Sequence, residues 1–444
     1  MKKQLLVILP LFALVFAAGC TKRPTTPANQ LGSPQRISSG TANASEPAIV
    51  TKDGTVYVVW VEHRDKAADV MFESFNGEGQ SLGAAIRVNP QAGQATAWRG
   101  DQPTIAVAPD KTVYVGWTGR ADAASGSSPD IYLSASRDGG KSFAVPMKVN
   151  DDPKPADHGM HSLAVAADGR VYVAWLDERN IAPMKDVAPA KDMKMNAGSS
   201  GHHMESNREL FFSTSADGGR SFSPNQRVAT DVCPCCKTNL AIGKDGRVYV
   251  SWRQVLPGDF RHIAVSSSSD QGKTFATATI VSNDEWMLKG CPVSGAALSA
   301  DADGTLRVLW YAGGDKGQRG IYWSESRDDG RTFSSRQLLA ASSARGTPVW
   351  LRDRVDAAAG LWQDGEGPKA QILGARFRND EKVASVPTGS PAVVAVKPTT
   401  FGAGELPAAA GIHDRVFIVY VAQDGEKQSI WLTTADTGKL DSTA

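Results

Sequence analysis

Hydrophobic and polar residues alternate in a short segment that recurs along the chain. The segment from Asp53 to Trp60 reads Asp-Gly-Thr-Val-Tyr-Val-Val-Trp, a turn pair that leads into β-branched and aromatic residues. This pattern predicts a half-buried strand that follows a tight turn. Similar segments occur at residues 110–117, 168–175, 245–252 and 303–310, with a weaker copy at 413–420 and a degraded one at 353–362. The chain is therefore expected to fold as repeated units of short strands.

A second motif follows most copies of this strand. Residues 136–143 read Ser-Arg-Asp-Gly-Gly-Lys-Ser-Phe, and the pattern returns at 215–222, 268–275 and 326–333. Its aspartate can accept backbone N–H groups across a hairpin, its glycine suits a positive φ, and its aromatic residue can anchor the turn in the core. The aspartates at positions 217, 270 and 328 lie 53 and 58 residues apart, whereas 79 residues separate positions 138 and 217. An insertion, at residues 181–207, accounts for the longer interval.

The second motif resembles the Asp-box (BNR) repeat of sialidases and related β-propellers. The resemblance covers nearly everything after residue 33 and implies an all-β fold, with residues 34–444 forming a single propeller of four-stranded blades. Units that begin near residues 45, 101, 160, 237, 295, 346 and 405 predict about seven blades. Six, the usual number in sialidases, is the alternative if one degenerate unit is decoration. Residues 34–39 resemble the ends of other units, so we expect this N-terminal strand to complete the last blade and close the ring.

The first residues predict export. Lys2 and Lys3 precede an apolar stretch at residues 5–16, which runs into Ala-Ala-Gly-Cys at positions 17–20. This pattern resembles the lipobox of bacterial lipoproteins, which implies a signal peptide over residues 1–19, an acylated Cys20 and a flexible tether over 20–33. A plain secretory peptide is the alternative. Thr21 stands where an inner-membrane protein would carry aspartate, so the resemblance implies an outer-membrane anchor facing the periplasm or the cell surface.

Charge and hydropathy narrow the choice of partners. The chain has 48 Lys and Arg against 47 Asp and Glu, a net charge of +1, which gives no indication of nucleic-acid binding. No later apolar run is long enough to span a membrane. We expect a monomer held at the membrane by its lipid, with a glycan or an envelope protein as the candidate partner.

The resemblance to sialidases extends only partly to their catalytic residues. That family holds the substrate carboxylate with three arginines and uses a tyrosine nucleophile and an aspartate acid/base. Glu46 stands where the first arginine is expected, and its carboxylate would repel the substrate. Of the 8 tyrosines, only Tyr311 lies off the repeat positions. If the chain hydrolyses glycosides, the candidate catalytic residues are Tyr311, Arg99, Arg253, Arg345 and Asp101, with Glu178 as a further acid; ordinary loop charges are the alternative interpretation.

Histidine and methionine gather in a region that the repeats do not explain. Four of the 7 histidines and five of the 9 methionines fall between positions 158 and 204. Thioether and imidazole groups together suit copper, Cu(I) especially, and a methionine in an exposed loop adds no packing. The candidate ligands are His158, Met160, His161, Met184, Met193, Met195, His202, His203 and Met204. A solvated loop that binds nothing is the alternative.

Four cysteines remain besides the lipidation candidate. Cys233, Cys235 and Cys236 precede the inner strand of the fourth unit, and Cys291 precedes that of the fifth. Disulfides are common in an oxidising compartment, and a bridge between neighbouring blades would be an ordinary staple. A metal or redox site is the other interpretation, and both can hold at once.

Alignment of the units indicates where these groups should meet. Superposing Leu163 on Leu240 places His158 at the position of Cys235, and superposing Leu240 on Leu298 places Cys233 at that of Cys291. Because inner strands surround the channel of a propeller, we expect these groups, with Met160 and His161, at one channel mouth.

The leading hypothesis is a membrane-tethered binding module, with a soft-metal (copper) or redox Cys/His/Met site at one mouth. An exo-α-sialidase or related glycoside hydrolase with a rearranged site is the first alternative. An envelope assembly or scaffold factor is the second.

Overall fold

The computed structural model describes residues 32–65, 67–96, 100–121, 127–181, 206–288, 292–314, 319–342, 346–352, 358–377, 392–393 and 398–436. Within these ranges the regular structure consists of strands, apart from one 3-10 helix, η1 (Gly367–Lys369). No helix among these residues is both long enough and apolar enough to cross a membrane. The prediction of an all-β fold is confirmed.

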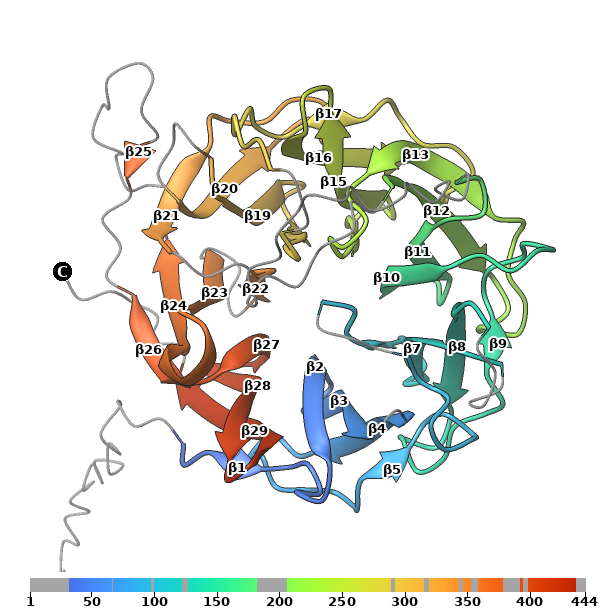
Figure 1. The fold of residues 1–444 in the computed structure, drawn as a ribbon, viewed down its shortest axis with the longest axis vertical. Helices are drawn as coiled ribbons and strands as arrows, with labels where there is room; N and C mark the ends of the chain where they lie inside the picture. Colours follow the sequence, from blue (N-terminus) through green and yellow to red (C-terminus); the bar gives the residue numbers. More distant parts are fainter. Residues whose placement is uncertain are drawn as a thin grey trace, which may run out of the picture.

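The strands of the described residues fall, in chain order, into sets of four, which we number one to seven (Figure 1). Set one contains β2 (Asn43–Lys52), β3 (Thr55–Arg64), β4 (Ala67–Phe75) and β5 (Ile86–Arg87). Set two contains β6 (Thr104–Val107), β7 (Val113–Gly119), β8 (Asp130–Ser136) and β9 (Met147–Lys148). Set three contains β10 (His158–Val165), β11 (Val171–Asp177), β12 (Arg208–Ser215) and β13 (Gln226–Val232). Set four contains β14 (Asn239–Ile242), β15 (Val248–Leu256), β16 (Phe260–Ser268) and β17 (Thr279–Ile280).

The remaining sets follow the same plan. Set five contains β18 (Ala296–Ala300), β19 (Leu306–Ala312), β20 (Gly320–Ser326) and β21 (Gln337–Ala341), with β25 (Ala392–Val393) parallel to β21. Set six contains β22 (Val349–Arg352), β23 (Ala358–Asp364), β24 (Gln371–Phe377) and β26 (Thr399–Ala403). Set seven contains β27 (Glu405–Ile412), β28 (Arg415–Asp424), β29 (Lys427–Asp436) and β1 (Gln35–Arg36).

Apart from β25, neighbouring strands within each set run antiparallel. The predicted pairing of the N-terminal segment with the last unit is present: Gln35 lies opposite Leu432, and Arg36 lies opposite Trp431. Sets three and four share one hydrogen-bonded sheet, because β13 meets β15 at the single pair Val232–Gln254. That junction immediately precedes the three clustered cysteines.

The sets follow one another around a common centre, from the blue first set to the red last one (Figure 1). Their first strands contact each other in succession: β2 contacts β6, β6 contacts β10, and the series continues through β14, β18 and β22 to β27. The last of these strands, β27, contacts β2 in turn. The seventh set therefore lies beside the first.

The hydrophobic core is divided between neighbouring sets. The repeat tryptophans at the ends of the predicted strands are fully buried, and they are the largest such side chains among the described residues: Trp60, Trp117, Trp175, Trp252, Trp310 and Trp362. Each contributes to a layer of apolar side chains; Trp60 packs with Phe417 and Val419 of the last set. Burial of such aromatic faces on both sides holds each sheet against its neighbours.

The Asp-box turns lie at matching hairpins between the third and fourth strands of sets two to five. In one of them, Asp217 accepts hydrogen bonds from the backbone N–H groups of Arg220 and Ser221, at 3.0 Å each, and from two serine hydroxyls. Asp138, Asp270 and Asp328 make equivalent contacts. The expected turn chemistry is therefore present.

A glycine of this turn is required by packing as well as by its positive φ. Gly140 has a φ of 90°, and a Cβ atom there would come within 2.3 Å of the Phe72 ring in the preceding set. Phe143 meets the same ring edge-on, with centroids 5.1 Å apart. The Asp-box turn thus presses against the neighbouring sheet, which explains why the motif ends in an aromatic residue.

Candidate functional site

Three cysteines converge in the segment that joins β13 to β14. The sulfur atoms of Cys233, Cys235 and Cys236 all lie within 4.8 Å of one another. The three residues are 0 %, 3 % and 0 % exposed. A turn over residues 234–235 folds the segment back on itself, and the Cys233 N–H donates to the Arg253 carbonyl at 2.9 Å, which fixes the first cysteine against β15.

The cysteines occur in two chemical states. Cys233 and Cys236 are free thiols whose sulfurs lie 3.4 Å apart. Cys235 is disulfide-bonded, and its partner lies outside the described residues. A disulfide, one of the two interpretations left open by the sequence, is therefore present at Cys235, beside two thiols that are not bridged.

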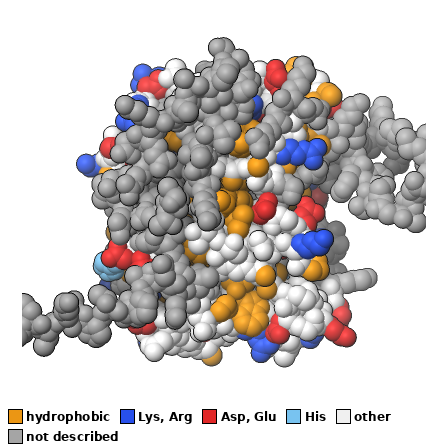
Figure 2. Space-filling view, turned by 90° about the vertical axis from the view of Figure 1, so that its left-hand side faces the viewer, with side chains coloured by type: hydrophobic (Ala, Val, Ile, Leu, Met, Phe, Trp, Pro, Cys, Tyr) orange, Lys and Arg blue, Asp and Glu red, His pale blue; other side chains and the backbone are white. Residues whose placement is uncertain are grey.

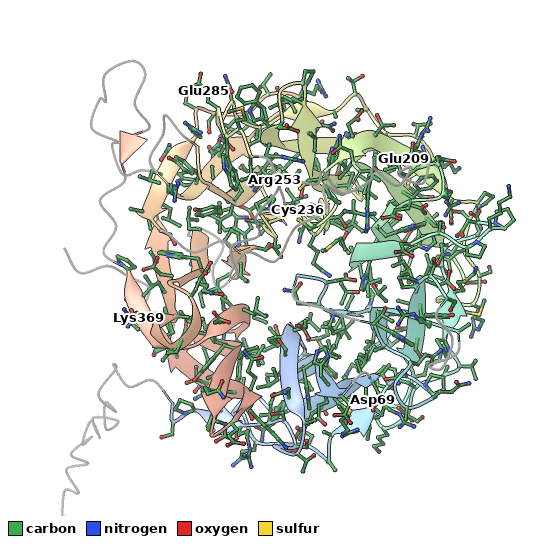
Figure 3. All side chains as sticks on the ribbon, viewed as in Figure 1. Asp69, Glu209, Cys236, Arg253, Glu285 and Lys369 are labelled. Carbon is green, nitrogen blue, oxygen red and sulfur yellow. The ribbon has the colours of Figure 1, made fainter. Side chains whose placement is uncertain are left out.

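Arg253 supplies a buried positive charge beside this cluster. Its side chain is 0 % exposed and donates to the backbone carbonyls of Ser294, Arg261 and Tyr311, at 2.9, 3.3 and 3.0 Å. Its guanidinium also lies 5.0 Å from the centroid of the Trp286 ring. In Figure 3, Arg253 and Cys236 lie close together toward the common centre of the sets, whereas Glu285 lies toward the outer edge of the fold.

The environment makes the two thiols unequal. Burial on its own would raise the pKa of Cys236, but the hydrogen bond with Cys233 and the charge of Arg253 lower that pKa to about 7. The same hydrogen bond, together with burial, raises the pKa of Cys233 well above its ordinary value. Since the thiolate is the nucleophile and the metal ligand, Cys236 is the more reactive sulfur of the pair.

His158 lies in a different cluster, of carboxylates. Its Nδ1 atom is 2.9 Å from the Pro129 carbonyl, and its Nε2 atom is 3.1 Å from Asp152 and 3.3 Å from Asp177. Burial alone would lower the pKa of His158, but these two carboxylates raise it to about 9. Arg179 completes the network by donating to both oxygens of Asp177. The imidazole and the guanidinium thus lie against buried acids, and ligand atoms of Asp130, Asp152 and His158 all lie within 4.8 Å of one another, close enough to hold a metal ion.

Asp101 joins three consecutive sets through a second buried network. Its carboxylate accepts the N–H of Met160 at 2.8 Å and the hydroxyl of Thr118 at 2.7 Å. Its oxygen also lies 3.4 Å from His161 and 3.6 Å from the Lys237 amine. Burial raises the pKa of Asp101, yet His161 and Lys237 together lower it to about 2. Burial lowers the pKa of Lys237 to about 8 despite the nearby carboxylate.

The structure therefore distributes the predicted metal ligands among several places. Met160, held at a φ of 53° in the bulge of β10, shares a hydrophobic cluster with Cys233, Cys235 and Cys236. His158 lies beside Asp130 and Asp152, apart from the cysteines, and His161 lies beside Asp101. The other candidates lie outside the described residues: Met184, Met193, Met195, His202, His203, Met204 and Cys291. Cys20 and the segments assigned as signal peptide and tether lie outside them as well, up to residue 31.

Of the candidate catalytic residues that the structure describes, Tyr311, Asp101 and Arg253 are enclosed, whereas the Glu178 side chain is 32 % exposed and pairs with Arg208. Tyr311 is 2 % exposed and meets the Trp286 ring edge-on, and Asp101 is 1 % exposed within its network. Arg253 points its donors at backbone carbonyls, as described above. Arg99 and Arg345 lie outside the described residues. At the position of the expected first arginine, Glu46 is buried and contacts His63 at 2.7 Å.

An apolar cavity of about 590 Å³ opens near the tip of the β15–β16 hairpin. Its walls are formed by Leu256, Pro257, Phe260, His262, Asn283, Glu285 and Met287. Trp286, which stacks on Arg253, belongs to the same loop as the cavity residues 285 and 287. Where Figure 2 shows described residues, on the side of β21, β24 and β26, hydrophobic side chains lie in small groups between polar ones.

Some participants were missed by the sequence analysis. Asp152, Asp177 and Lys237 were not predicted as site residues, because isolated acidic residues and lysines are common in loops. Two signals were present: Asp177 follows the repeat Trp175 by two residues, and Lys237 directly follows Cys236. The sequence analysis considered Arg253 only as a candidate catalytic arginine. Because Arg253 directly follows the repeat Trp252, the sequence also indicated a buried strand position for it.

Comparisons with known proteins support the fold. No family model matches the chain, and no curated protein matches it. An ulvan lyase of polysaccharide lyase family PL25 is similar to it with a TM-score of 0.54 and 12 % identity, over 89 % of this chain and 94 % of the lyase. The same lyase bound to -[GlcA(1-4)Rha3S]- gives a TM-score of 0.53 and 13 % identity, over 89 % and 94 %. NanB sialidase from Streptococcus pneumoniae gives 0.48 and 10 %, over 87 % and 84 %. The lyase similarity shows a shared fold, and identities this low carry no activity from one protein to another.

Proposed function

We propose that this protein is an exported, lipid-anchored β-propeller of seven blades that acts as a binding module and holds a soft metal ion, Cu(I), at its cysteine cluster. The seven strand sets, the unbroken succession of contacts from β2 round to β27 and back, and the pairing of β1 with β29 support the closed ring. A ring without free sheet edges suits a stable scaffold. Export and the lipid on Cys20 rest on the N-terminal sequence.

The convergence of three sulfur atoms carries the metal part of the proposal. Metal–sulfur bonds are about 2.3 Å long, so three thiolates around one ion lie roughly 3.8–4.0 Å apart. The mutual limit of 4.8 Å for Cys233, Cys235 and Cys236 accommodates this arrangement. Cys235 must be reduced before it can be a ligand. With the disulfide intact, Cys233 and Cys236 are left as a two-thiolate pair, which would open from its 3.4 Å separation to admit the ion.

The electrostatics of the cluster also favour Cu(I). Thiolate and thioether groups are soft ligands that suit Cu(I), and Met160 lies in the same hydrophobic cluster as the cysteines. Three thiolates and one monovalent ion carry a net negative charge, which the buried guanidinium of Arg253 partly offsets. The Asp101 carboxylate already accepts hydrogen bonds from Met160 and Thr118, so we do not include it among the ligands.

Copper loading under reducing, anaerobic conditions tests the proposal. Reduced protein is incubated with Cu(I), separated from free metal in the presence of a Cu(I) chelator, and analysed for bound copper. We expect about one tightly held ion per chain. The Cys233→Ser/Cys236→Ser variant should retain less than about a tenth of that amount.

A loop variant provides the matched control. Replacing His202 and His203 by alanine leaves the cysteine cluster intact, so that variant should retain copper as the wild type does. Copper retention unchanged by the double serine substitution, or lost on removing the loop histidines, would contradict a cysteine-centred site.

Glycoside hydrolysis is the second candidate, and the lyase similarity favours it only at the level of the fold. The enclosure of Tyr311, Arg253 and Asp101 supports the binding role instead. A screen with fluorogenic sialosides decides between them: we expect no turnover above buffer. Turnover that Tyr311→Phe abolishes would overturn the binding-module proposal.

A further inference from the structure

The imidazole ring of His158 has one nitrogen that is engaged and one that is available to a ligand. Its side chain is 0 % exposed, and its Nδ1 atom lies 2.9 Å from the Pro129 carbonyl. Because a carbonyl only accepts hydrogen bonds, Nδ1 carries the proton that it donates there. Among the described residues the buried Nε2 atom has no hydrogen-bond partner, although it faces Asp152 at 3.1 Å and Asp177 at 3.3 Å. A histidine held in this way by a backbone carbonyl has the usual form of a metal-ligating histidine.

Two carboxylates complete a candidate site around this nitrogen. Asp130 begins β8, Asp152 follows β9, and one ligand atom from each of Asp130, Asp152 and His158 lies within 4.8 Å of the others. Bonds from zinc to imidazole nitrogen and carboxylate oxygen are about 2.0–2.2 Å long, so neighbouring ligand atoms lie roughly 3.0–3.5 Å apart. The 3.1 Å between His158 Nε2 and Asp152 Oδ1 already has this length. The Asp130 oxygen, 4.0 Å from His158 Nδ1, would move inward.

Asn150 holds both carboxylates in position. Its side-chain amino group donates to Asp130 at 2.7 Å and to Asp152 at 2.6 Å. Its side-chain oxygen accepts the Ile131 N–H at 2.9 Å, so the backbone of β8 orients the amide. A carboxylate oxygen has two lone pairs, and one can accept from Asn150 while the other faces an ion. Partners of this kind orient the ligands of protein metal sites.

The corresponding junction of set one shows what the repeat itself requires. There Asn89 donates to Asp69 at 2.9 Å and accepts the next backbone N–H at 2.7 Å, as Asn150 does in set two. Its other hydrogen bond goes to the backbone carbonyl of Gln91, which stands in the place of Asp152. With the repeat tryptophans superposed, a glycine at position 100 takes the place of His158. The second carboxylate and the histidine are therefore additions to the repeat, which one aspartate satisfies.

The charge of the cluster also fits a divalent ion. Four carboxylates and two basic side chains are joined by the contacts around it: Asp130, Asp151, Asp152 and Asp177, with Lys148 and Arg179. Four negative charges against two positive ones leave an excess of two negative charges while His158 is neutral, and one divalent ion balances it. Asp177 accepts hydrogen bonds from Trp175 and Arg179, so we leave it outside the ligand set. Buried charge is costly unless it is compensated in this way.

We propose that Asp130, Asp152 and His158 form a binding site for a divalent ion of the zinc type, which links sets two and three. An imidazole nitrogen and carboxylate oxygens suit Zn²⁺, whereas the cysteine cluster offers sulfur. The Asp130 side chain is 19 % exposed, which gives an ion a path from solvent. In the metal-free chain a proton takes the place of the ion on Nε2. This site goes beyond the copper proposal and does not depend on it.

Zinc loading of a chain that lacks the other candidate ligands tests the proposal. The parent is the full chain with Cys233→Ser, Cys236→Ser, His202→Ala and His203→Ala. It is stripped of metal with a chelator, dialysed against Zn²⁺ near neutral pH, separated from free metal and analysed for bound zinc. We expect about one ion per chain. X-ray absorption at the zinc edge should show only nitrogen and oxygen neighbours, at about 2.0–2.2 Å.

Two substitutions in the parent locate the ion. His158→Gln should retain less than about a tenth of the zinc, and Asp152→Asn, which keeps the shape of the side chain, should weaken zinc binding about tenfold or more. Zinc should raise the midpoint of thermal unfolding of the parent, and this rise should be absent in His158→Gln. His161→Gln is the matched control, because His161 is equally buried beside Asp101, and it should retain zinc as the parent does.

The parent decides the outcome even if a variant does not fold, which circular dichroism would reveal. A parent that retains no zinc, or that holds zinc through sulfur, would overturn the site. So would zinc that survives in folded His158→Gln or Asp152→Asn, or zinc that is lost equally from folded His161→Gln.

Discussion

The cysteine cluster and the His158 cluster occupy corresponding places in neighbouring repeat units, yet they differ in chemistry. His158 is enclosed by Asp152 and Asp177, and Arg179 neutralises the remaining charge. The thiols of Cys233 and Cys236 instead contact each other and lie near the positive charge of Arg253. One repeat position therefore carries a buried histidine among carboxylates in set three and a buried group of cysteines in set four. The side chains that surround this repeat position, more than its place in the repeat, determine its chemistry.

The largest loss of stability is expected from removing the positive charge of Arg253, which distinguishes the cysteine cluster from the His158 cluster. Arg253→Met leaves three buried carbonyl groups without their donor, at about 1–3 kcal/mol each, so unfolding free energy should fall by roughly 3 kcal/mol or more. Urea unfolding measures the loss. Arg327, whose side chain is 64 % exposed beside Glu325, provides the control, since Arg327→Met should change stability by less than about 0.5 kcal/mol. Equal effects of the two substitutions would contradict a structural role for Arg253.

The His158 network should show itself in the pH dependence of stability. The pKa of His158 is raised from 6.5 to about 9 in the folded chain. Its stabilisation is therefore complete below pH 6.5 and is lost as pH rises through 9, and it amounts to about 3 kcal/mol. The difference in unfolding free energy between wild type and His158→Gln should shrink by about that amount from pH 6 to pH 9.5.

His413 offers a matched comparison for this titration, because it lies exposed in the turn between β27 and β28. The same measurements on His413→Gln show what the loss of an exposed histidine does, and a deficit that shrinks as much there as in His158→Gln would contradict the role given to the His158 network. A His158→Gln variant whose deficit stays constant over the range would mean that His158 is neutral in the folded protein.

The smallest effect is expected at the Asp-box turns, far from both clusters. Asp270→Ala removes the acceptor for the Thr274 N–H and for the hydroxyls of Ser268 and Thr274. The loss should be about 1 kcal/mol, as at a helix N-cap, because the turn is exposed and water replaces part of the bonding. Asp245→Ala, which removes one acceptor of the Arg247 N–H, should cost less. Thermal unfolding resolves the two, and a larger loss at Asp245 would go against this account of the motif.

The fold could be predicted because the same strand and turn pattern recurs several times along the chain. Alternating strands that end in tryptophan and hairpins that carry Asp-box turns appear where the pattern placed them, and residues 35–36 pair with the last unit as expected. Local turn chemistry and strand patterning depend on neighbours in the sequence, which a sequence displays directly.

The chemistry of the site was only partly predictable. The spacing of Cys233, Cys235 and Cys236 indicated a cluster, but the division into two thiols and one disulfide depends on side-chain directions. The surroundings of His158 and Arg253 could not be predicted, since their partners Asp152, Asp177 and Ser294 come from other parts of the chain. A long-range pairing of charges leaves no periodic signal in a sequence.

The most direct test of the reactive cluster is X-ray absorption at the copper edge of the Cu(I)-loaded protein. A cysteine-centred site predicts two or three sulfur neighbours at about 2.3 Å, and their loss in Cys233→Ser/Cys236→Ser. A first coordination shell of nitrogen or oxygen in the wild type, or a sulfur shell that survives the double substitution, would contradict the account.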